Sequence, residues 1–546
     1  MTLTLMFRML MANHYIVAAI IGAVLLLYRY IKGRYRFFAE RNIPYGKPTF
    51  LLGSHGPVLL KERDLYQQIQ HIYNEFPNAK IVGGFDFLKP VWIVRDPELI
   101  KRIGVKDFDH FVDRMPVFSL PDEEVDKDRL MENMLLALRG QKWRDMRATL
   151  SPAFTGSKMR HMFGLVVKCA ESTAEFYVSE AKYGRRLELE MKEVFSKLCN
   201  DMIASVAFGI QVDSFRESQN DFYMMGKELL NFKKITTIPK VLIFRATPWL
   251  ARRLKIDLFS ASLLTYFKRM ITDNMQYRDT NGIVRNDMID MLMQARKGAL
   301  KHQIEELDSK EAGFATVEES SVGKTMQNRV WSDNELIAQC FLFFIGGFET
   351  LSTFLQFLSY ELMANPKVQQ RLHEEILLIE ASLNNQPLTY DVLQKMHYMD
   401  MVVSEALRLW PPGPFIDRFC VKNYVFENAE GCKIQIDRGQ IVWLPIVALH
   451  RDPQYFPEPN KFIPERFNEE NRSRINAATY LPFGIGPRNC IGSRLALMEV
   501  KAIIYSLLKK FSFVQTTKSQ VPLRLSKTIL GPIPERGVWL ELKPRT

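Results

Sequence analysis

The segment from residue 332 to residue 364 constrains the fold more than any other part of the chain, because it predicts a helix that is apolar on nearly every side. Ser332 and Glu335 form the pattern of a capping box at its start, and Pro366 ends it. At a rise of about 1.5 Å per residue the helix would be about 50 Å long. Such a helix must cross the core of a large domain, so we expect the rest of the chain to pack around it.

Spaced apolar residues predict many further helices, and short β-branched or aromatic runs predict a few strands. The helices are expected at 130–150, 159–183, 187–208, 220–232, 257–278, 286–297, 366–384, 398–409 and 493–511. The strands are expected at 80–83, 91–94, 440–444, 521–525 and 538–542. No repeat with a period of 20 to 50 residues is present. The prediction is one large, mainly α domain with small β-sheets, in which the polar segment 298–329 forms a surface linker.

The first 48 residues predict a membrane anchor and a neck. Residues 9–28 are almost wholly apolar, and about 20 such residues span a bilayer. Basic residues follow at once, which predicts that the remaining chain stays in the cytosol. A cleaved signal peptide is the alternative, but Tyr28 and Arg29 stand where small residues would precede its cleavage. We expect an anchor at 1–31, a basic, proline-containing neck at 32–48 and a globular domain at 49–546.

The charge distribution favours a membrane over nucleic acid as a partner. The chain has a net charge of +12, of which +5 lies in the first 41 residues. The rest is too dilute for a basic nucleic-acid-binding stripe. Segment 235–264 interleaves apolar and basic residues, so it predicts either a stretch that dips into a bilayer surface or an ordinary helix-loop-helix.

The sequence from Phe483 to Gly492, Phe-Gly-Ile-Gly-Pro-Arg-Asn-Cys-Ile-Gly, suits a metal-bound sulfur. Its glycines permit a close approach of the backbone, and Cys490 stands just before a predicted helix, where the helix dipole favours a thiolate. A buried structural cysteine and a catalytic nucleophile are the alternatives, and the second needs a histidine partner that no local motif supplies. None of the six cysteines forms a CxxC pair, which suggests a reducing compartment.

This loop resembles the cysteine-ligand loop of cytochrome P450 enzymes. The resemblance extends over nearly the whole chain and implies a cytochrome P450 fold, with a single haem domain behind the anchor. It implies haem b (iron protoporphyrin IX) as cofactor, Cys490 as the iron ligand, Phe483 as a shield of the sulfur and Arg488 as a propionate partner.

Gly346-Gly-Phe-Glu349-Thr350 resembles the oxygen-activating stretch of the family. Helical spacing predicts that Glu349 and Thr350 lie on the face of Gly346, beside a groove. The resemblance implies that both are catalytic and deliver protons to dioxygen. A pair of glycines that only permits close helix packing is the alternative. Many members have Asp in place of Glu349, and Leu351 replaces a small hydroxyl residue, which puts a second hydroxyl of the relay in doubt.

Two further sets of residues match the family. Glu405 and Arg408, spaced as ExxR, form with Arg466 its structural triad. The remaining set is implied to bind the haem propionates and consists of Trp143, Arg147, Arg114, Arg418 and His450.

The resemblance is closest to insect microsomal enzymes that metabolise xenobiotics, in the same clan as vertebrate drug oxidases. It implies a monooxygenase in the endoplasmic reticulum membrane, with its haem domain on the cytosolic side. No GxGxxG or P-loop is present, so electrons from NADPH must arrive through a partner. NADPH-cytochrome P450 reductase is the implied partner, and cytochrome b5 is a second candidate. Their docking cations are expected to be Lys142, Arg144, Lys433 and Arg494, unless these are plain solvated charges.

The implied substrates are hydrophobic small molecules such as xenobiotics, insecticides and plant toxins. Their contacts are expected in 113–120, 222–250, 341–348, 411–416 and 528–532. Phe118, Phe344, Phe348 and Phe415 suggest an aromatic pocket. A narrow-specificity biosynthetic hydroxylase for a steroid or hormone is an alternative, as is a haem sensor that performs no oxygenation. The neck departs from the family's proline-glycine repeat.

Overall fold

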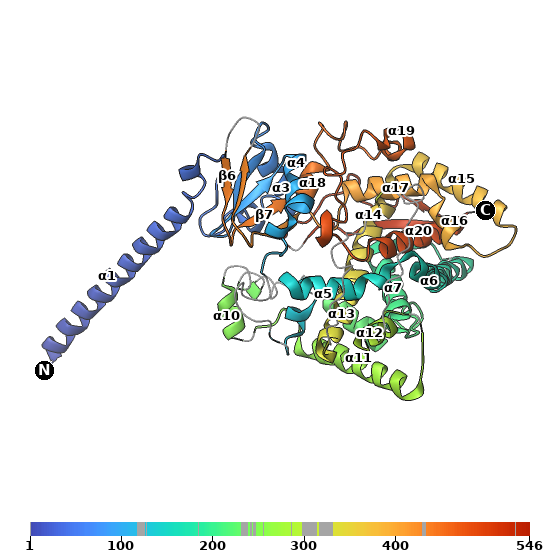
Figure 1. Cartoon of the computed structure of the whole chain (residues 1–546), viewed down its shortest axis with the longest axis horizontal. Helices are drawn as coiled ribbons and strands as arrows, with labels where there is room; N and C mark the ends of the chain where they lie inside the picture. Colours follow the sequence, from blue (N-terminus) through green and yellow to red (C-terminus); the bar gives the residue numbers. More distant parts are fainter. Residues whose placement is uncertain are drawn as a thin grey trace.

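The computed structural model describes residues 2–116, 126, 128–183, 185–230, 239–240, 243, 247–254, 256–285, 287–297, 314–315, 331–427, 433–529 and 531–545. Figure 1 shows one long helix, α1 (Thr2–Arg34), that projects from the body of the molecule. Some of the strands lie beside the end of α1, most of the helices lie beyond them, and the C-terminus lies on the side of the molecule away from α1. The predicted mainly α fold with small β-sheets is confirmed.

The helical part contains most of the predicted helices. Its longer members are α3 (Leu65–Asn74), α5 (Gly140–Leu150), α6 (Gly156–Lys182), α7 (Met191–Ile203), α8 (Asp221–Leu230), α10 (Pro248–Arg253), α11 (Ala261–Asn281), α12 (Met288–Arg296), α13 (Asp333–Ile345), α14 (Leu351–Ala364), α15 (Pro366–Leu383), α17 (His397–Leu409) and α20 (Ser493–Lys510). The short ones are α2 (Gly56–Leu59), α4 (Pro97–Lys101), α16 (Tyr390–Gln394), α18 (Ile446–Leu449) and α19 (Glu469–Arg472).

The strands form three small sheets. One has the order β1 (Ile81–Asp86), β2 (Lys89–Val94), β7 (Ile441–Leu444), β4 (Ile416–Phe419), with β2 and β7 parallel. A second has the order β3 (Glu188–Glu190), β9 (Trp539–Pro544), β8 (Phe511–Val514), and β5 (Tyr424–Glu427) pairs with β6 (Lys433–Ile436). The predicted strand at 521–525 is wrong, because this segment makes only an isolated bridge between Leu525 and Pro534.

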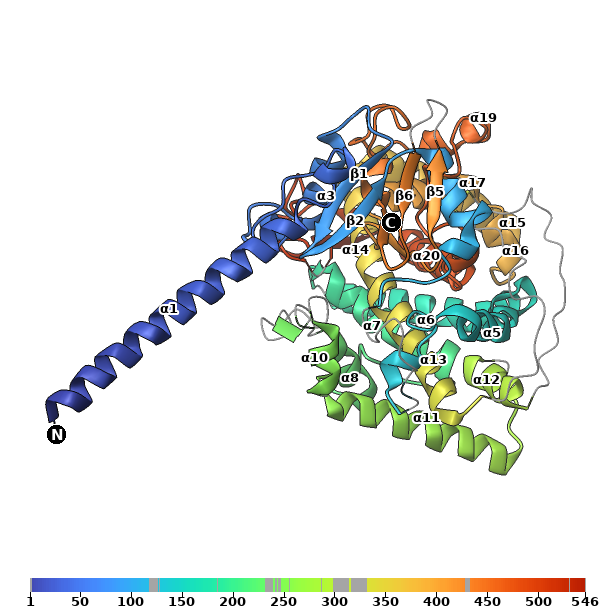
Figure 2. The same cartoon turned by 60° about the vertical axis from the view of Figure 1, so that its left-hand side comes forward.

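The central helix is present but is not regular throughout. Ser332 and Glu335 form the predicted capping box, in which the Glu335 amide donates to Ser332 Oγ at 3.3 Å and the Ser332 amide to Glu335 Oε2 at 3.0 Å. Between α13 and α14 the five residues Gly346–Thr350 form a π-helix, η8. Figure 2 shows α13 among α5, α6, α7 and α12. A π-turn inside an α-helix widens the turn locally and often marks a functional site.

Two predicted helices are shorter than expected. Residues 130–150 divide into a 3-10 helix, η4 (Leu130–Asn133), and α5, because the backbone is extended at Met134 after η4 and at Arg139 before α5. Residues 187–208 begin as strand β3, and the helix α7 ends in a π-helix, η6 (Ala204–Phe208).

Among the described residues, two helical spans are long and apolar enough to cross a membrane. One is the central helix, Asp333–Ala364, which is mostly buried within the protein. The other, Tyr15–Arg41, is only 6% buried, and apolar side chains such as Ile20 and Leu26 are exposed along it. The N-terminal helix is therefore a candidate membrane anchor.

One other sequence prediction falls largely outside the described residues, and a second falls partly outside them. In the linker 298–329 only Phe314 and Ala315 are described, and they pack on the protein instead of lying free on its surface. The Phe314 ring lies 4.8 Å from that of Phe467. In segment 235–264, Trp249 on α10 is 56% exposed.

Candidate active site

A cavity of about 400 Å³ lies between the central helix and the loop that precedes α20. Thr350, Leu351 and Phe354 line it from the central helix. Cys490 lines it from the loop, and its side chain has an accessible surface although it lies deep in the protein. The predicted groove beside the central helix and the predicted cysteine ligand therefore face the same space.

The conformation of the cysteine loop depends on its glycines. Gly484 and Gly486 have φ angles of 89° and 69°, which other residues rarely adopt. A Cβ atom on Gly486 would lie 1.8 Å from the carbonyl oxygen of Gly104, so only glycine permits this contact. The Cys490 amide donates to the Phe483 carbonyl at 2.8 Å, which closes the loop, and Phe483 also lines the cavity.

Burial raises the pKa of the Cys490 thiol, while the Gly492 amide, Arg147 and Arg114 lower it. The sequence predicted that the helix dipole favours a thiolate at Cys490, but removal of the sulfur from solvent disfavours the charged form. A metal that binds the sulfur would reverse the balance, because metal binding deprotonates a thiol.

Positive charge gathers at one end of the cavity. Arg114, Trp143, Arg147 and Arg488 all line it, as the sequence predicted for propionate partners. Arg147 donates to the Asn489 carbonyl at 2.9 Å and to its side-chain oxygen at 2.6 Å. The Arg488 guanidinium lies 4.0 Å above the Trp143 ring.

Arg418 lies two residues beyond Ile416, a cavity-lining residue of β4, and is fully buried. Burial and the nearby Arg114 lower its pKa to about 9, and its Nε has no hydrogen-bond partner among the described residues. Burial also lowers the pKa of Arg488 well below its usual range. These are signs of positive charge that lacks sufficient anions, since burial disfavours an uncompensated ion. The cavity with its thiol and buried arginines fits a haem with two propionates.

Arg488 is also bound to the protein itself. Its guanidinium donates to the carbonyls of Val112 at 2.8 Å, Leu135 at 3.2 Å and Leu138 at 2.6 Å. Arg488 therefore also fixes the loop against the segment before α5.

The two residues predicted to be catalytic are neighbours in the π-helix η8, but their side chains lie in different surroundings. Thr350 lines the cavity, and its hydroxyl makes no hydrogen bond within the described part of the chain. Glu349 does not line the cavity, and instead pairs with Lys192 of α7 at 2.8 Å. The expectation that both lie on the face of Gly346 is therefore wrong, because the wider turn changes the helical spacing on which it relied.

The two glycines of this stretch have different roles. A Cβ atom added to Gly346 would meet nothing within 4 Å, so this residue opens the helix to the cavity. A Cβ atom added to Gly347 would lie 2.7 Å from Cδ1 of Ile203 on α7, so Gly347 permits close helix packing. The sequence offered two interpretations of this glycine pair, a groove beside the helix and close helix packing. The first applies to Gly346 and the second to Gly347.

Lys192 connects Glu349 to two hydroxyl groups. Its Nζ donates to Ser352 Oγ at 2.7 Å and to Thr353 Oγ1 at 2.8 Å. The Thr353 hydroxyl donates in turn to Glu349 Oε1 at 3.2 Å. Leu351 contributes no hydroxyl, but Ser352 and Thr353 supply two beside the carboxylate.

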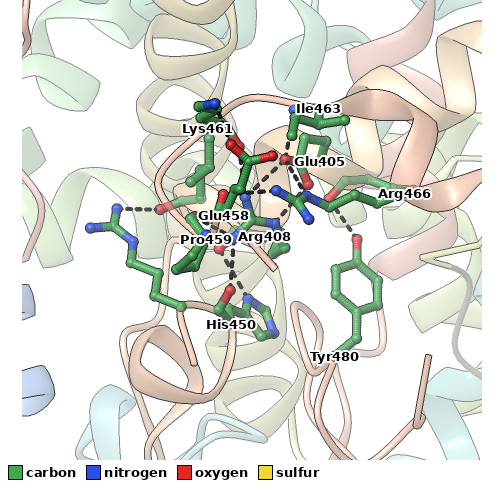
Figure 3. A network of polar contacts seen from close by, with 12 residues as sticks. Glu405, Arg408, His450, Glu458, Pro459, Lys461, Ile463, Arg466 and Tyr480 are labelled. Carbon is green, nitrogen blue, oxygen red and sulfur yellow. Dashed lines mark hydrogen bonds and ion pairs between the residues drawn. The ribbon is translucent and has the colours of Figure 1, made fainter. Parts of the chain in front are cut away.

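Figure 3 shows the predicted triad as part of a network of polar contacts. Arg408 donates to both oxygens of Glu405, at 2.7 and 2.8 Å, and Arg466 donates to Glu405 Oε1 at 3.3 Å. Arg408 also donates to the carbonyls of His450, Pro459 and Lys461.

His450 belongs to this network and does not line the cavity. Its Nδ1 lies 3.2 Å from the Arg408 carbonyl, and its Nε2 accepts from the Leu481 amide at 2.8 Å. Burial and the nearby Arg408 lower its pKa to about 3, so the ring is neutral. With both nitrogens engaged by the backbone, His450 does not occupy the position predicted for a propionate contact.

The aromatic residues proposed for the substrate pocket differ in their positions. Phe415 lines the cavity, whereas Phe344 and Phe348 do not. Phe344 packs on Phe267 of α11, with ring centres 4.5 Å apart, and stacks on Phe348 at 5.4 Å. Phe118 lies outside the described residues. Besides Phe415, the aromatic lining includes Phe154, Phe343 and Phe354, so the pocket is aromatic as predicted but with a partly different set of phenylalanines.

Three of the predicted docking cations, Lys142, Arg144 and Lys433, form ion pairs within the described part of the chain. Lys142 binds Glu335 at 2.6 Å and is mostly buried, and Arg144 binds Asp109 at 2.7 Å. Lys433 lies on β6, 3.7 Å from Glu427, and Arg494 is in the first turn of α20.

The fold and the site define the class of haem-thiolate proteins, in which a cysteine faces a cavity for a flat, anionic macrocycle. A sequence profile described as Cytochrome P450 matches residues 44–539. The chain is 41% identical over 525 residues to "Probable cytochrome P450 9f2" of Drosophila melanogaster, covering 96% of this chain and 98% of that protein. It is 41% identical over 544 residues to "Cytochrome P450 9e2" of Blattella germanica, covering 97% of each chain, and 33% identical over 512 residues to "Cytochrome P450 6k1" of the same species, covering 93% of each.

The chain belongs to the cytochrome P450 family. It is a haem-binding monooxygenase, and the family implies a redox partner and hydrophobic substrates.

Sequence reasoning missed three residues of the site. Lys192 belongs to no motif, and Asn489 belongs to the cysteine loop but had no role assigned to it. Only the fold brings them to Glu349 and Arg147. Glu499 lines the cavity from α20 although it is 3% exposed. One signal was present in the sequence, since Glu499 stands between Met498 and Val500 in an apolar stretch.

Proposed function

We propose that this protein inserts one atom of dioxygen into apolar small molecules at the cavity, with electrons from NADPH delivered by NADPH-cytochrome P450 reductase. The observation that carries the proposal is the position of Cys490 and Thr350 in the lining of one cavity. The bound haem supplies oxygen activation through its thiolate-ligated iron. Xenobiotics, including insecticides and plant toxins, are the proposed substrates.

The haem would be held by residues from four parts of the chain. Cys490 would bind the iron, with Phe483 beside the sulfur. Arg114, Arg147 and Arg488 in the lining, and the buried Arg418 beside Arg114, would supply positive charge for the propionates, and Trp143 would supply a flat surface below Arg488. The buried Nε of Arg418 is the donor that most needs an acceptor.

Thr350 and Glu349 would divide the handling of protons. The Thr350 hydroxyl faces the cavity and can donate a hydrogen bond to a substrate oxygen there. Glu349 is partly exposed and stands with Lys192 between the helix and the exterior, where it can exchange protons with solvent. A change of side-chain rotamer or a water molecule is needed to join them.

The pocket favours apolar substrates. Apart from the arginines at one end, its lining is mainly Leu, Ile, Val and Phe side chains. Relatives named as cytochromes P450 of the 9 and 6 types occur in insects, in agreement with the insect enzymes that the sequence resembles, and the proposed xenobiotic role rests on that resemblance. The exposed apolar helix α1 would anchor the enzyme in the endoplasmic reticulum membrane.

The test begins with the carbon monoxide difference spectrum of the reduced protein. A Soret band at the thiolate-ligated position that is lost in Cys490→Ala identifies cofactor and ligand together. Reconstitution with the reductase and NADPH, against a panel of insecticides and steroid precursors, then tests electron source and substrate class. Turnover of a single steroid alone would refute the proposed xenobiotic role.

The role of Thr350 is tested separately. Thr350→Ala is expected to keep the haem spectrum and to consume NADPH with about 10²-fold less product, the lower end of the usual contribution of a positioned acid. Ser359→Ala is the matched control, because Ser359 lies on the same helix, is fully buried and bonds only to the Gln356 carbonyl among the described residues. Equal product formation by the two variants would refute the assignment.

A further inference from the structure

Glu499 is a carboxyl group in the cavity wall that the proposed mechanism does not use. Among the described residues that line the cavity, it is the only Asp or Glu. It lies on α20, six residues after the first residue of the helix and therefore about 9 Å along its axis. The helix begins three residues after Cys490, so the carboxyl lies on the element that directly follows the loop of the proposed iron ligand.

Among the residues that the structure describes, no cation lies beside the Glu499 carboxyl. Within the described part of the chain, no hydrogen bond or ion pair reaches it, and no charged group changes its pKa. The cations Arg147 and Arg114 act on Cys490 and not on Glu499. The positive charge of the site thus lies at the cysteine end of the cavity.

The elements packed near Glu499 offer few titratable groups. Burial raises the pKa of two thiols, Cys169 of α6 and Cys199 of α7, and the negative charge of Glu499 raises it further. Other charged groups near these thiols are Asp201, Lys192, Glu349 and Lys168. The central helix presents Thr350, Leu351 and Phe354 to the cavity, which do not titrate.

Burial alone raises the pKa of Glu499 to about 8. The sign follows from desolvation, which disfavours the charged form of a carboxyl group. At neutral pH the group is mostly the neutral acid, and at about pH 8 half of it is ionised. A carboxyl poised in this way responds to any change of charge in the cavity.

We propose that Glu499 is a redox-linked proton site, which takes up a proton when the bound haem takes up an electron. The inference rests on the proposed function, in which a reduced flavin of the reductase supplies that electron. The electron reduces the iron from ferric to ferrous. One proton from solvent converts the Glu499 carboxylate to the acid, so the O–H bond is the only bond formed and net charge in the cavity is unchanged.

Coulomb's law gives the size of the linkage. A unit charge added roughly 10 Å away, at an effective dielectric constant of about 20, shifts the pKa of a carboxyl group by about one unit. Reduction should therefore raise the proton affinity of Glu499 about tenfold. Reciprocally, the reduction potential of the haem should fall with rising pH between about 8 and about one unit higher, and be flat below that range.

The experiment is a spectroelectrochemical titration of the haem-loaded protein across this pH range. Wild type is expected to show the fall in potential. Glu499→Gln should keep the wild-type potential at neutral pH, because its amide is neutral like the acid, and should lose the fall. Glu499→Asp should keep it. Infrared difference spectra of wild type should independently show a protonated carboxyl band that disappears near pH 8 and is absent from Glu499→Gln.

Glu361→Gln is the matched control. Burial raises the pKa of Glu361 to about 7, but it bonds to Trp410 and does not line the cavity, so its variant should retain the fall. A fall that persists in Glu499→Gln would assign the linkage to another group, such as Arg418, and overturn the proposal. A flat wild-type profile would also overturn it. A protein without a thiolate-type carbon monoxide spectrum would instead refute the proposed function.

Discussion

Removal of the Arg408 side chain should destabilise the protein more than any other single change in the buried network of Figure 3. All five N–H groups of this guanidinium donate hydrogen bonds, two to Glu405 and three to backbone carbonyls. Both side chains of the pair are completely buried. Arg408→Leu leaves an ionised Glu405 inside the protein with only Arg466 and the Ile463 amide to stabilise it.

The expected loss follows from these bonds. Breaking a buried ion pair costs about 3 to 5 kcal/mol, and each carbonyl that loses its donor adds about 1 kcal/mol. The total, about 6 to 8 kcal/mol, is comparable with the whole stability of many domains. Arg466→Ala removes one bond of 3.3 Å to Glu405 and one to the Glu458 carbonyl, and should cost only about 1 to 2 kcal/mol.

The assay is chemical denaturation followed by haem absorbance, together with the yield of soluble haem-loaded protein. Arg408→Lys keeps the charge and should fall between wild type and Arg408→Leu. The double variant Glu405→Leu, Arg408→Leu should be more stable than Arg408→Leu alone, because no unpaired carboxylate remains. Equal stability of Arg408→Leu and Arg466→Ala would refute the reasoning.

Three further outcomes are expected. Gly347→Ala should destabilise the protein by about 1 to 3 kcal/mol, because its Cβ would overlap Ile203. An unfolding temperature equal to that of wild type would contradict this role of Gly347. Gly346→Ala should unfold at the wild-type temperature but bind large substrates more weakly, measured by spectral titration, because its Cβ would enter the cavity. Burial raises the pKa of Glu361 from 4.5 in the unfolded chain to about 7 in the folded protein. The protonated carboxyl therefore contributes to stability fully below about pH 4.5, and this contribution is lost as the pH rises through about 7. Relative to Glu361→Gln, wild type should lose about 3 kcal/mol over this range, and parallel stability curves would contradict the assigned pKa.

The sequence predicted those parts of the site that depend on local spacing. The cysteine loop, the ExxR pair and the capping box of the central helix each depend on residues a few positions apart, and their side chains lie where that spacing places them. Burial in the core of the central helix followed from its apolar surface on all sides.

The remaining errors have physical causes that lie outside local spacing. Glu349 turns to Lys192 because five residues adopt a π-helix, and no local pattern distinguishes that helix from an α-helix. Phe344 and Phe348 face α8 and α11, and their direction depends on which helices pack there. His450 has both of its nitrogens bonded to backbone groups more than 30 residues away in sequence.

The contacts that close the haem cavity also determine when it can form. Arg147 meets Asn489 across 342 positions of the chain, and Arg488 meets Leu138 across 350. Contacts between such distant segments form slowly, because a long loop must close before they are made. On the ribosome the helices of the first half therefore emerge without the loop that completes the cavity. They must stay soluble with the apolar wall of the cavity uncovered until residues 483–492 arrive, and the haem must bind after that step.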